Sequence, residues 1–450
     1  MKNEDRLRPY IQNPTYWQYK QQPVLLAGGS KTDHIFLLDD LKDHLDDIHA
    51  VGGNCVRNTM SQREARSLKP YLLREDGQFD LESWNADYWQ RFQSLLRWTA
   101  ERDIVVQIEV WDRFDYSRDN WDHSPWNPGN NVNYTYEETG FSPTYPLHPS
   151  ADVHPFFHTI PSMSQYRPHY DLVRGHQERF AEKLLSYSLP YGHVLYCMNN
   201  ETSTDPAWGR YWIRFIAARA ADAGVTVYTT DMFDDAWRGQ DSVHFPVVLH
   251  DPEVYTFVDV SQVNSRNFHE IHWTRLRWLL EQVSRRPRPA NNTKVYGGNH
   301  SMWGSGGNAH GVHRFWRDLI GGCAGARFHR PPSGNGLNER AKASLQAVRK
   351  LETQVKLWDV APQMDLLVDR AHEVYVTARP GVAYVLYFVD SAESVSAELD
   401  LAPHPVPFTL RWLSIDKGEW GSEMSDIEGG EVVQLAPPDR GNWLGVLVKA

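Results

Sequence analysis

The stretch HVLYCMNNETS, residues 193–203, is an apolar run that breaks abruptly into two asparagines and a glutamate. An uninterrupted run of this kind is typical of a strand buried on both faces, as in a parallel sheet. Seven further runs of this type alternate with amphipathic helical segments: PVLLAGG (23–29), NCVRNTM (54–60), IVVQIEV (104–110), VTVYTTD (225–231), TFVDVSQ (256–262), TKVYGGN (293–299) and CAGARFH (323–329).

This alternation predicts the fold class. Eight strands joined by crossover helices are typical of an α/β protein with a (β/α)8 TIM barrel, here over residues 1–358. The rival fold, an open doubly wound sheet, is disfavoured because no G-x-G-x-x-G follows an early strand. After Trp358, short alternating segments such as EVYVTAR and AYVLYFV predict a small C-terminal antiparallel β-sandwich over residues 359–450.

Charge and composition exclude several classes of function. The 450 residues include 46 Lys and Arg against 57 Asp and Glu, so the net charge is −11 and nucleic-acid binding is disfavoured. No apolar run approaches the roughly 20 residues that cross a bilayer, and the sequence predicts a soluble protein. The start, MKNEDRLRPYIQ, lacks the apolar stretch of a signal peptide. We therefore expect a cytoplasmic protein, or a periplasmic or secreted one if a leader has been removed.

Motifs for cofactors and metals are missing from the sequence. Its three cysteines, Cys55, Cys197 and Cys323, have no metal-ligand spacing and are too few for a disulfide framework. There is no HExxH and no G-x-S-x-G, and GSGGNAHG (304–311) lacks the Lys-Ser/Thr of a phosphate loop. That glycine-rich segment is predicted to be a mobile loop over the site. The sequence predicts no cofactor and no metal.

Aromatic residues are unusually abundant, with 18 Trp, 21 Tyr and 17 Phe. Flat apolar rings suit a ligand that has apolar faces and polar edges, as sugars have. The long segment 111–168 is rich in Asn, Pro, His and aromatics and follows the third strand, so we expect it to cover the C-terminal face of the barrel. The predicted partner is a carbohydrate.

Side chains at the C-terminal ends of barrel strands point into the active site, which turns the strand list into a list of site candidates. The polar residues assigned to these ends are Asn54, Arg57, Asn58, Glu109, Asp112, Asp115, Asn199, Asn200, Glu201, Asp231, Asp234, Asp259, Gln262, Asn299, His300, His329 and Arg330. Trp111, Trp126 and Trp303 are candidates for stacking against sugar rings.

The Asn200-Glu201 pair resembles the large clan of (β/α)8 glycoside hydrolases in which the strand-4 acid/base glutamate follows an asparagine. NCVRNT around Arg57 resembles the strand-2 arginine of that clan. A barrel followed by a segment like AYVLYFVDSAESVSAELDLA looks like the apiosidase-like glycosidases with their C-terminal domain. The resemblance implies a glycoside hydrolase acting on a polysaccharide or a derived oligosaccharide, with Glu201 as the general acid.

The chain departs from that clan at strand 7, where a nucleophilic glutamate is expected and TKVYGGNHSMWGSG contains no carboxylate. Hydrolysis of glycosides usually needs two carboxyl groups. Asp231, at the end of the neighbouring fifth strand, is the first choice for the second one, followed by Asp112, Asp115 and Glu109.

The remaining candidates are predicted to bind substrate. Arg57, Asn200, Asn299 and His300 would hold hydroxyls, and His329 and Arg330 a hydroxyl or a carboxylate. Two alternatives stay open. One is a non-catalytic carbohydrate-binding barrel. The other is a lyase or isomerase on uronic sugars, with His300 or His329 as the base and Arg330 clamping the carboxylate.

Overall fold

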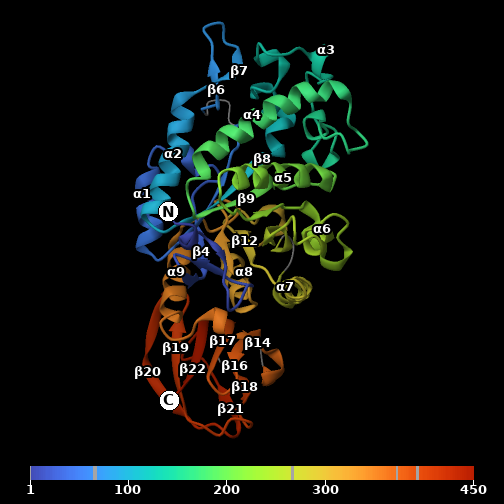
Figure 1. Ribbon diagram of the computed structural model, residues 1–450. Helices are drawn as coiled ribbons and strands as arrows, with labels where there is room; N and C mark the ends of the chain where they lie inside the picture. The colour runs from blue at the N-terminus through green and yellow to red at the C-terminus, as the bar shows by residue number, and fades with distance from the viewer. Residues whose placement is uncertain (1, 64–67, 265–267, 371–372, 392–394) are drawn as a thin grey trace.

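The computed structural model describes residues 2–63, 68–264, 268–370, 373–391 and 395–450. The barrel forms one end of an elongated molecule, and antiparallel sheets built from the C-terminal residues form the other (Figure 1).

All eight predicted barrel strands are present in one parallel sheet, in the order β10-β9-β8-β5-β4-β13-β12-β11. Their bounds are β4 (Leu26–Gly29), β5 (Cys55–Thr59), β8 (Val105–Asp112), β9 (Val194–Asn200), β10 (Thr229–Thr230), β11 (Val258–Asp259), β12 (Ala290–Val295) and β13 (Gly325–Phe328). The sheet nearly closes between β10 and β11, where the Phe257 N–H donates to the Thr229 carbonyl oxygen at 3.4 Å. The predicted (β/α)8 barrel is confirmed.

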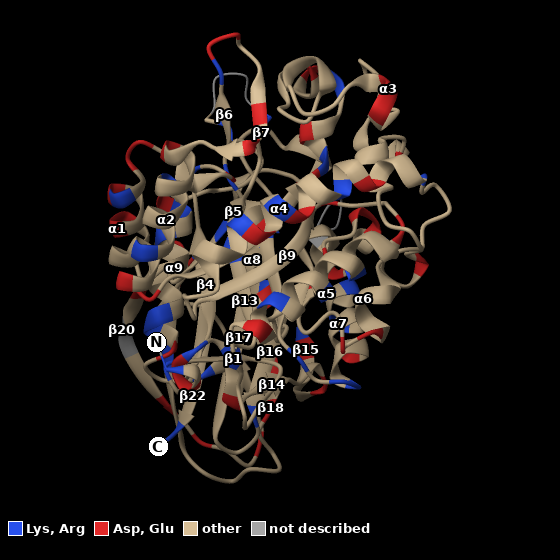
Figure 2. Cartoon of the chain, turned by 45° about the horizontal axis from the view of Figure 1, so that its top comes forward, with Lys and Arg blue, Asp and Glu red and all other residues tan. Residues whose placement is uncertain are grey.

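The barrel helices follow their strands as predicted, and side-chain caps fix several of their starts. Asn85, Asp205 and Asn338 each accept a hydrogen bond from a main-chain N–H in the first turn of α2, α5 and α9. The bounds are α1 (Leu41–Ala50), α2 (Ala86–Glu101), α4 (Asp171–Ser188), α5 (Pro206–Asp222), α6 (Pro246–His250), α7 (His269–Ser284), α8 (Asn308–Ile320) and α9 (Glu339–Leu351). Acidic and basic residues are mixed along these outer helices (Figure 2).

Helix α8 corrects part of the predicted glycine-rich loop, because it begins at Asn308 inside GSGGNAHG. The reason is close packing. A Cβ on Gly311 would lie 2.6 Å from the carbonyl oxygen of Gly297, so glycine lets the first turn of the helix approach the segment that follows β12.

The N-terminal residues close the bottom of the barrel with a three-stranded antiparallel sheet, β1 (Arg8–Pro9), β2 (Trp17–Tyr19) and β3 (Gln22–Val24). Trp17 is fully buried there. Its ring lies edge-on to Tyr228 and Phe257, which precede β10 and β11, and its Nε1 donates to Asn291 Oδ1 at 3.0 Å.

Two excursions extend the opposite end of the barrel, remote from the C-terminal sheets (Figure 1). One is the hairpin of β6 (Tyr71–Leu73) and β7 (Phe79–Trp84), and the other is the long segment between β8 and α4, which includes α3 (Tyr136–Thr139). The long segment has an aromatic core of its own, in which Phe156 contacts Tyr116, Trp126 and Trp208. Its short 3-10 turns are Arg113–Tyr116, Arg118–His123, Pro128–Asn130, Pro149–Ala151, Pro155–Phe157 and Pro168–Tyr170.

The C-terminal residues form two antiparallel sheets. The larger has the order β14 (Ala361–Pro362), β16 (Val374–Arg379), β17 (Ala383–Ser391), β22 (Gly441–Lys449), β19 (Phe408–Ser414) and β20 (Glu419–Ile427). The smaller has the order β15 (Leu367–Arg370), β18 (Ala397–Asp400) and β21 (Val432–Leu435).

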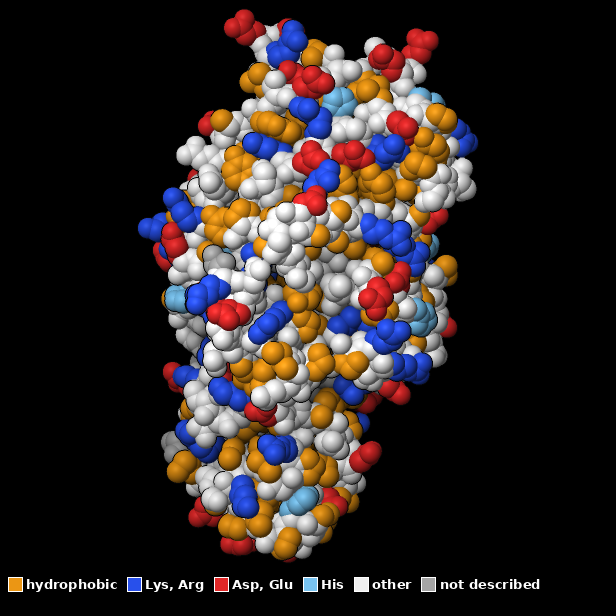
Figure 3. Space-filling model, viewed as in Figure 1, with side chains coloured by type: hydrophobic (Ala, Val, Ile, Leu, Met, Phe, Trp, Pro, Cys, Tyr) orange, Lys and Arg blue, Asp and Glu red, His pale blue; other side chains and the backbone are white. Residues whose placement is uncertain are grey.

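Both faces of the larger sheet are buried, which explains the continuous apolar run of β17. Leu386 and Phe388 belong to the core shared with the smaller sheet, whereas Val385 and Tyr387 belong to a core shared with Trp316 of α8. The sheets and the barrel therefore pack through one hydrophobic layer. On the face shown in Figure 3, hydrophobic side chains are scattered among charged ones.

The cysteines and the helices of the described residues give two further findings. All three cysteines are buried and unbonded. No helix in the described part of the chain is long and apolar enough to span a membrane.

Two glycines test the barrel packing in opposite directions. A Cβ on Gly28 would lie 1.8 Å from the carbonyl oxygen of Cys55, its partner in β5, so Gly28→Ala should lower the free energy of unfolding by about 1–3 kcal/mol. Nothing lies within 4 Å of a Cβ on Gly175 in α4, so Gly175→Ala should raise it by about 0.5–1 kcal/mol. Urea unfolding of both variants measures the difference, and equal midpoints would contradict this packing.

Candidate active site

A cavity of about 660 Å³ opens at the C-terminal ends of the barrel strands. The long segment after β8 contributes part of its wall, as the sequence predicts for a cover of this face. The lining residues are Asp33, Arg63, Phe114, Arg118, His148, Ser150, Asn200, Glu201, Asp234, Trp237, Gln262, Lys294, Tyr296, Trp303, His329 and Arg330.

Glu201 is the first residue after β9 and has a left-handed backbone conformation, with φ of 60°. Its Oε1 accepts from Lys294 Nζ, from Tyr296 Oη at 3.1 Å and from Gln262 Nε2 at 3.2 Å. In the described part of the chain no donor contacts Oε2. One carboxylate oxygen is thus fixed by three donors, while the other is available to a ligand.

Lys294 determines the charge of Glu201. Burial raises the pKa of Glu201, but the positive charge of Lys294 and the hydrogen bonds from Lys294 and Tyr296 outweigh it, so this pKa lies below its ordinary 4.5. Burial likewise lowers the pKa of Lys294, and the charge of Glu201 reverses this, so the pKa is raised. Both groups are therefore charged at neutral pH. Glu201 does not hold the proton that its predicted role as general acid requires.

A second carboxyl group shares the cavity, that of Asp234 at the start of a 3-10 turn (Asp234–Asp241). Burial, followed by the negative charge of Glu201, raises its pKa to about 7. Its main-chain N–H donates to the Thr202 carbonyl oxygen at 2.9 Å, which ties it to the turn that carries Glu201. Asp234 holds a proton over much of the range in which Glu201 is ionised.

Asp231, the predicted second carboxylate, does not line this cavity. Its Oδ1 accepts from the main-chain N–H groups of Asn199 and Met232, and both oxygens accept from Asn199 Nδ2. A Cβ on Gly209 would lie 2.2 Å from Oδ2, so the carboxyl group packs against α5 on the outside of the strands. Burial raises its pKa to about 7, but the group has no access to a ligand in the cavity.

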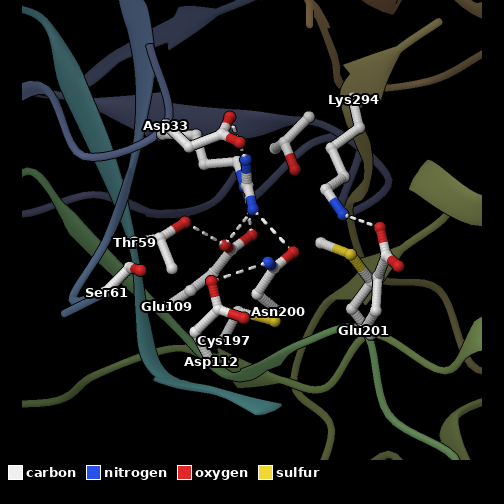
Figure 4. Close-up of polar contacts among 12 residues, drawn as sticks. Asp33, Thr59, Ser61, Glu109, Asp112, Cys197, Asn200, Glu201 and Lys294 are labelled. Carbon is white, nitrogen blue, oxygen red and sulfur yellow. Dashed lines mark hydrogen bonds and ion pairs between the residues drawn. The ribbon is translucent and has the colours of Figure 1, made fainter. Parts of the chain in front are cut away.

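The floor beneath the cavity is a buried ionic network centred on Arg57, which is fully buried. Its guanidinium donates to Glu109, to Asp33 Oδ1 at 2.5 Å and to Asn200 Oδ1 at 2.7 Å. Thr59 Oγ1 adds a hydrogen bond to Glu109 at 2.7 Å. Figure 4 shows the Glu201–Lys294 pair beside this cluster.

Asp112 and Asp115 support the floor and do not line the cavity. Asp112 accepts from Asn200 Nδ2 at 3.0 Å and pairs with Arg63. Asp115 accepts from Ser61 Oγ at 2.7 Å and from the Gln62 N–H at 2.6 Å. The structure thus gives Arg57, Glu109, Asp112 and Asp115 a supporting position in place of the predicted contact with substrate.

Three predicted residues form the opposite wall. His329 is buried, and burial holds the pKa of its imidazole well below the ordinary value, so the ring is neutral. Arg330 Nε donates to Asp33 Oδ2 at 2.7 Å. The Trp303 side chain is 51% exposed and its ring centroid lies 5.5 Å from that of Tyr296, which leaves a flat apolar face for a ligand.

Three other predicted residues lie elsewhere. Trp126 is fully buried in the aromatic core of the long segment and does not stack against a ligand. Asn299 and His300 lie in an exposed turn outside the cavity lining. This position also removes His300 as the base of a lyase.

Sequence reasoning missed the cation opposite Glu201 because it misplaced one strand. Strand 7 was predicted at 293–299, whereas β12 runs over Ala290–Val295, so Lys294 and Tyr296 stand at the strand end. Asp33 and His148 were also missed. Asp234 and Gln262 were recognised as strand-end residues but assigned no role.

Among the described residues, no group of three or more His, Cys, Asp or Glu is arranged to hold a metal ion.

Comparisons with known proteins show which solved structures share this fold. No family model matches the chain, and no curated protein matches it in sequence. A glycoside hydrolase family 5 structure from Bacteroides vulgatus ATCC 8482 is similar with a TM-score of 0.64 at 11% identity, covering 99% of this chain and 94% of that chain. A second structure, named glycoside hydrolase, has a TM-score of 0.62 at 10% identity and covers 99% and 97%.

Gamma-CGTase from alkalophilic Bacillus clarkii is similar with a TM-score of 0.53 at 12% identity, covering 98% of this chain and 71% of that chain. The likeness to these glycoside hydrolases therefore concerns the fold and includes the C-terminal sheets.

A double-mutant cycle on the free energy of unfolding tests the ion pair between Glu201 and Lys294. Glu201→Gln leaves a buried ammonium without its counter-charge and should lower the free energy of unfolding by about 1–3 kcal/mol, less than for a fully buried pair because the carboxylate is 21% exposed. The double variant Glu201→Gln/Lys294→Met should lose less than the sum of the two single variants in a denaturant titration at pH 7. Simple additivity would contradict the pair.

Proposed function

We propose that this protein is a glycoside hydrolase that acts on a polysaccharide or an oligosaccharide derived from one. The observation that carries the proposal is a pair of carboxyl groups in one cavity, Glu201 ionised and Asp234 with a pKa raised to about 7. Hydrolysis of a glycosidic bond uses such a pair, a protonated acid for the leaving oxygen and a carboxylate on the other side of the sugar. The similarity in fold to known glycoside hydrolases supports it.

Asp234 is the proposed general acid. It protonates the glycosidic oxygen as the bond to the anomeric carbon breaks. Glu201 is the proposed nucleophile or the base that takes a proton from water, with Oε2 as the reacting atom. If the two carboxyl groups lie about 5–5.5 Å apart around a bound sugar, Glu201 attacks the sugar directly. If they lie about 6.5–9.5 Å apart, there is room for a water molecule that Glu201 activates as base.

Lys294 and Tyr296 act on Glu201 as positioning residues. Their hydrogen bonds hold Oε1 and keep the carboxylate ionised, which the reaction needs at the moment of attack. The aromatic faces of Trp303 and Trp237 line the cavity where a sugar ring would stack. The finer resemblance to apiosidase-like glycosidases stays a prediction.

A carbohydrate-binding protein without catalysis is the second candidate. One observation favours it: a lysine stands at the end of strand 7, where the clan that the sequence resembles has a glutamate, and it pairs with Glu201. The two candidates share the cavity and the ligand, and release of reducing sugar from a bound oligosaccharide separates them.

The two carboxyl groups predict the pH dependence of hydrolysis. The acid must be protonated, so kcat/KM should fall about tenfold per pH unit above about 7, the pKa to which Asp234 is raised. Glu201 must be ionised, and its pKa lies below the ordinary 4.5, so on the acidic side kcat/KM should fall only below about pH 4.5. A reducing-sugar assay from pH 3 to 9 measures both limbs, and a rate that keeps rising above pH 8 would exclude these roles.

A matched pair of variants tests the acid. Asp234→Asn cannot deliver a proton and should reduce kcat at least about 10²-fold on a substrate with a poor leaving group. Asp231→Asn removes a carboxyl group of similar pKa from the same stretch of chain, but one that packs against α5, and should leave kcat within a few fold. The opposite ranking, with Asp231→Asn inactive and Asp234→Asn active, would restore the role that the sequence suggests for Asp231.

A further inference from the structure

The cavity has a different charge balance from the rest of the chain. The protein has a net charge of −11, yet four cations line the cavity, Arg63, Arg118, Lys294 and Arg330, against three acidic residues. One of those acids, Asp234, is only partly ionised at neutral pH. Cations and acids thus nearly balance in the cavity lining, so the question is which of the cations lacks a partner within the protein.

Three of the four cations are paired within the protein. Lys294 pairs with Glu201, and Arg63 pairs with Asp112. Arg330 pairs with Asp33, which also binds the buried Arg57.

Arg118 is different. Among the described residues, no carboxylate or other acceptor lies within hydrogen-bond distance of its guanidinium. The residue is exposed to the cavity, but its backbone is fixed, with φ of 56° and the main-chain N–H donating to the Tyr145 carbonyl oxygen at 2.6 Å. Its guanidinium lies 5.9 Å from the ring centroid of Phe114.

The surroundings of Arg118 include a second arginine, an aromatic ring and a histidine. The guanidinium of Arg63 lies 5.5 Å from the same Phe114 ring, so two positive groups flank one aromatic side chain. Next to them, His148 Nδ1 forms a hydrogen bond with Ser150 Oγ at 2.8 Å. An anionic group bound here would form charge-assisted hydrogen bonds with Arg118, the cation that has no partner among the described residues, while Arg63 stays paired with Asp112.

The acceptors of the cavity support the same conclusion. Asp33 accepts hydrogen bonds from Arg57 and Arg330, and Asn200 Oδ1 accepts one from Arg57, so these oxygens are already engaged. A neutral sugar presents hydroxyls that both donate and accept. Within the described part of the chain, the group without a partner beside Phe114 is the cation Arg118, whereas Oε2 of Glu201 and the carboxyl group of Asp234 are the groups of the proposed reaction.

We infer that the sugar bound in this cavity carries an anionic substituent, a carboxylate or a sulfate ester, and that Arg118 binds it. The inference rests on the proposed function, because it specifies the substrate class of that same cavity. Arg118 is then the residue that selects acidic sugars over neutral ones, and a guanidinium suits the planar, two-oxygen face of a carboxylate.

The test uses full-length protein on a glycan array with matched oligosaccharides that are neutral, contain a uronic acid, or contain a 6-O-sulfate. Members that bind are then titrated by calorimetry into the Asp234→Asn variant, which keeps the cavity but not the proposed acid. We expect the uronic or sulfated members to bind at least about 10-fold more tightly than their neutral partners, and the gap to shrink in high salt. The two anionic sets decide between carboxylate and sulfate.

Arg118→Gln should weaken binding of the anionic oligosaccharide about 10- to 100-fold and change binding of the neutral one by less than about threefold. Arg97→Gln is the matched control, because it removes the same charge from an exposed position on α2 and should change neither. Hydrolysis is measured separately by release of reducing sugar.

The outcomes separate the two proposals. Tight binding of acidic sugars without hydrolysis keeps this inference and rejects the hydrolase. Hydrolysis of neutral sugars with no preference for acidic ones keeps the hydrolase and overturns this inference. It is also overturned if no oligosaccharide on the array binds, or if Arg118→Gln and Arg97→Gln behave alike.

Discussion

A fully buried arginine imposes the main constraint on this barrel. Arg57 cannot lose its charge at any physiological pH, so every carboxylate and amide around it must remain in place to compensate for its burial. Its partners come from the segment after β4 (Asp33), from β8 (Glu109) and from β9 (Asn200), which ties three neighbouring parts of the barrel to β5. Asn200 immediately precedes Glu201. The network that neutralises a buried charge therefore also fixes the residue immediately before Glu201, the proposed nucleophile or base.

A second charge determines which carboxyl group keeps its proton. Two carboxyl groups that share one cavity repel each other when both are ionised, so one of them tends to keep its proton. Lys294 lies against Glu201, so Glu201 is the one that ionises, and its negative charge then helps to raise the pKa of Asp234. A lysine at strand 7 thus does more than replace an expected acid. It assigns the proton to Asp234, and this opposes the role of general acid that the sequence motif suggests for Glu201.

The sequence predicted the fold well because barrel strands leave a strong local pattern, and all eight apolar runs became strands of one sheet. It predicted the site only in part. Glu201, Asn200, Trp303, His329 and Arg330 line the cavity, since each stands at or just beyond a strand end. The sequence placed Asp231 in the cavity, but its side chain lies on the outer side of the sheet. Neighbouring residues at a strand end point to opposite sides, and the sequence alone does not say which residue points inward. Lys294 was missed because β12 contains Asn291, Asn292 and Lys294, polar residues that look unlike a strand until their buried partners Trp17, Asp318 and Glu201 are known.

The proposed catalytic pair lies above the weakest part of the barrel wall. β10 and β11 are two residues long, and the main-chain hydrogen bond between them is the long Phe257–Thr229 contact. Side chains compensate, since the Thr229 N–H donates to Thr256 Oγ1 at 2.8 Å and Thr229 Oγ1 donates to the Val254 carbonyl oxygen at 2.9 Å. Above them, Lys294 of β12 reaches across this gap to Glu201 after β9. Short strands free the residues that follow them to turn inward, as Asp234 and Gln262 do. The ion pair then holds together, through side chains, a seam that the backbone closes only loosely, so the groups proposed for chemistry also support the barrel on which they stand.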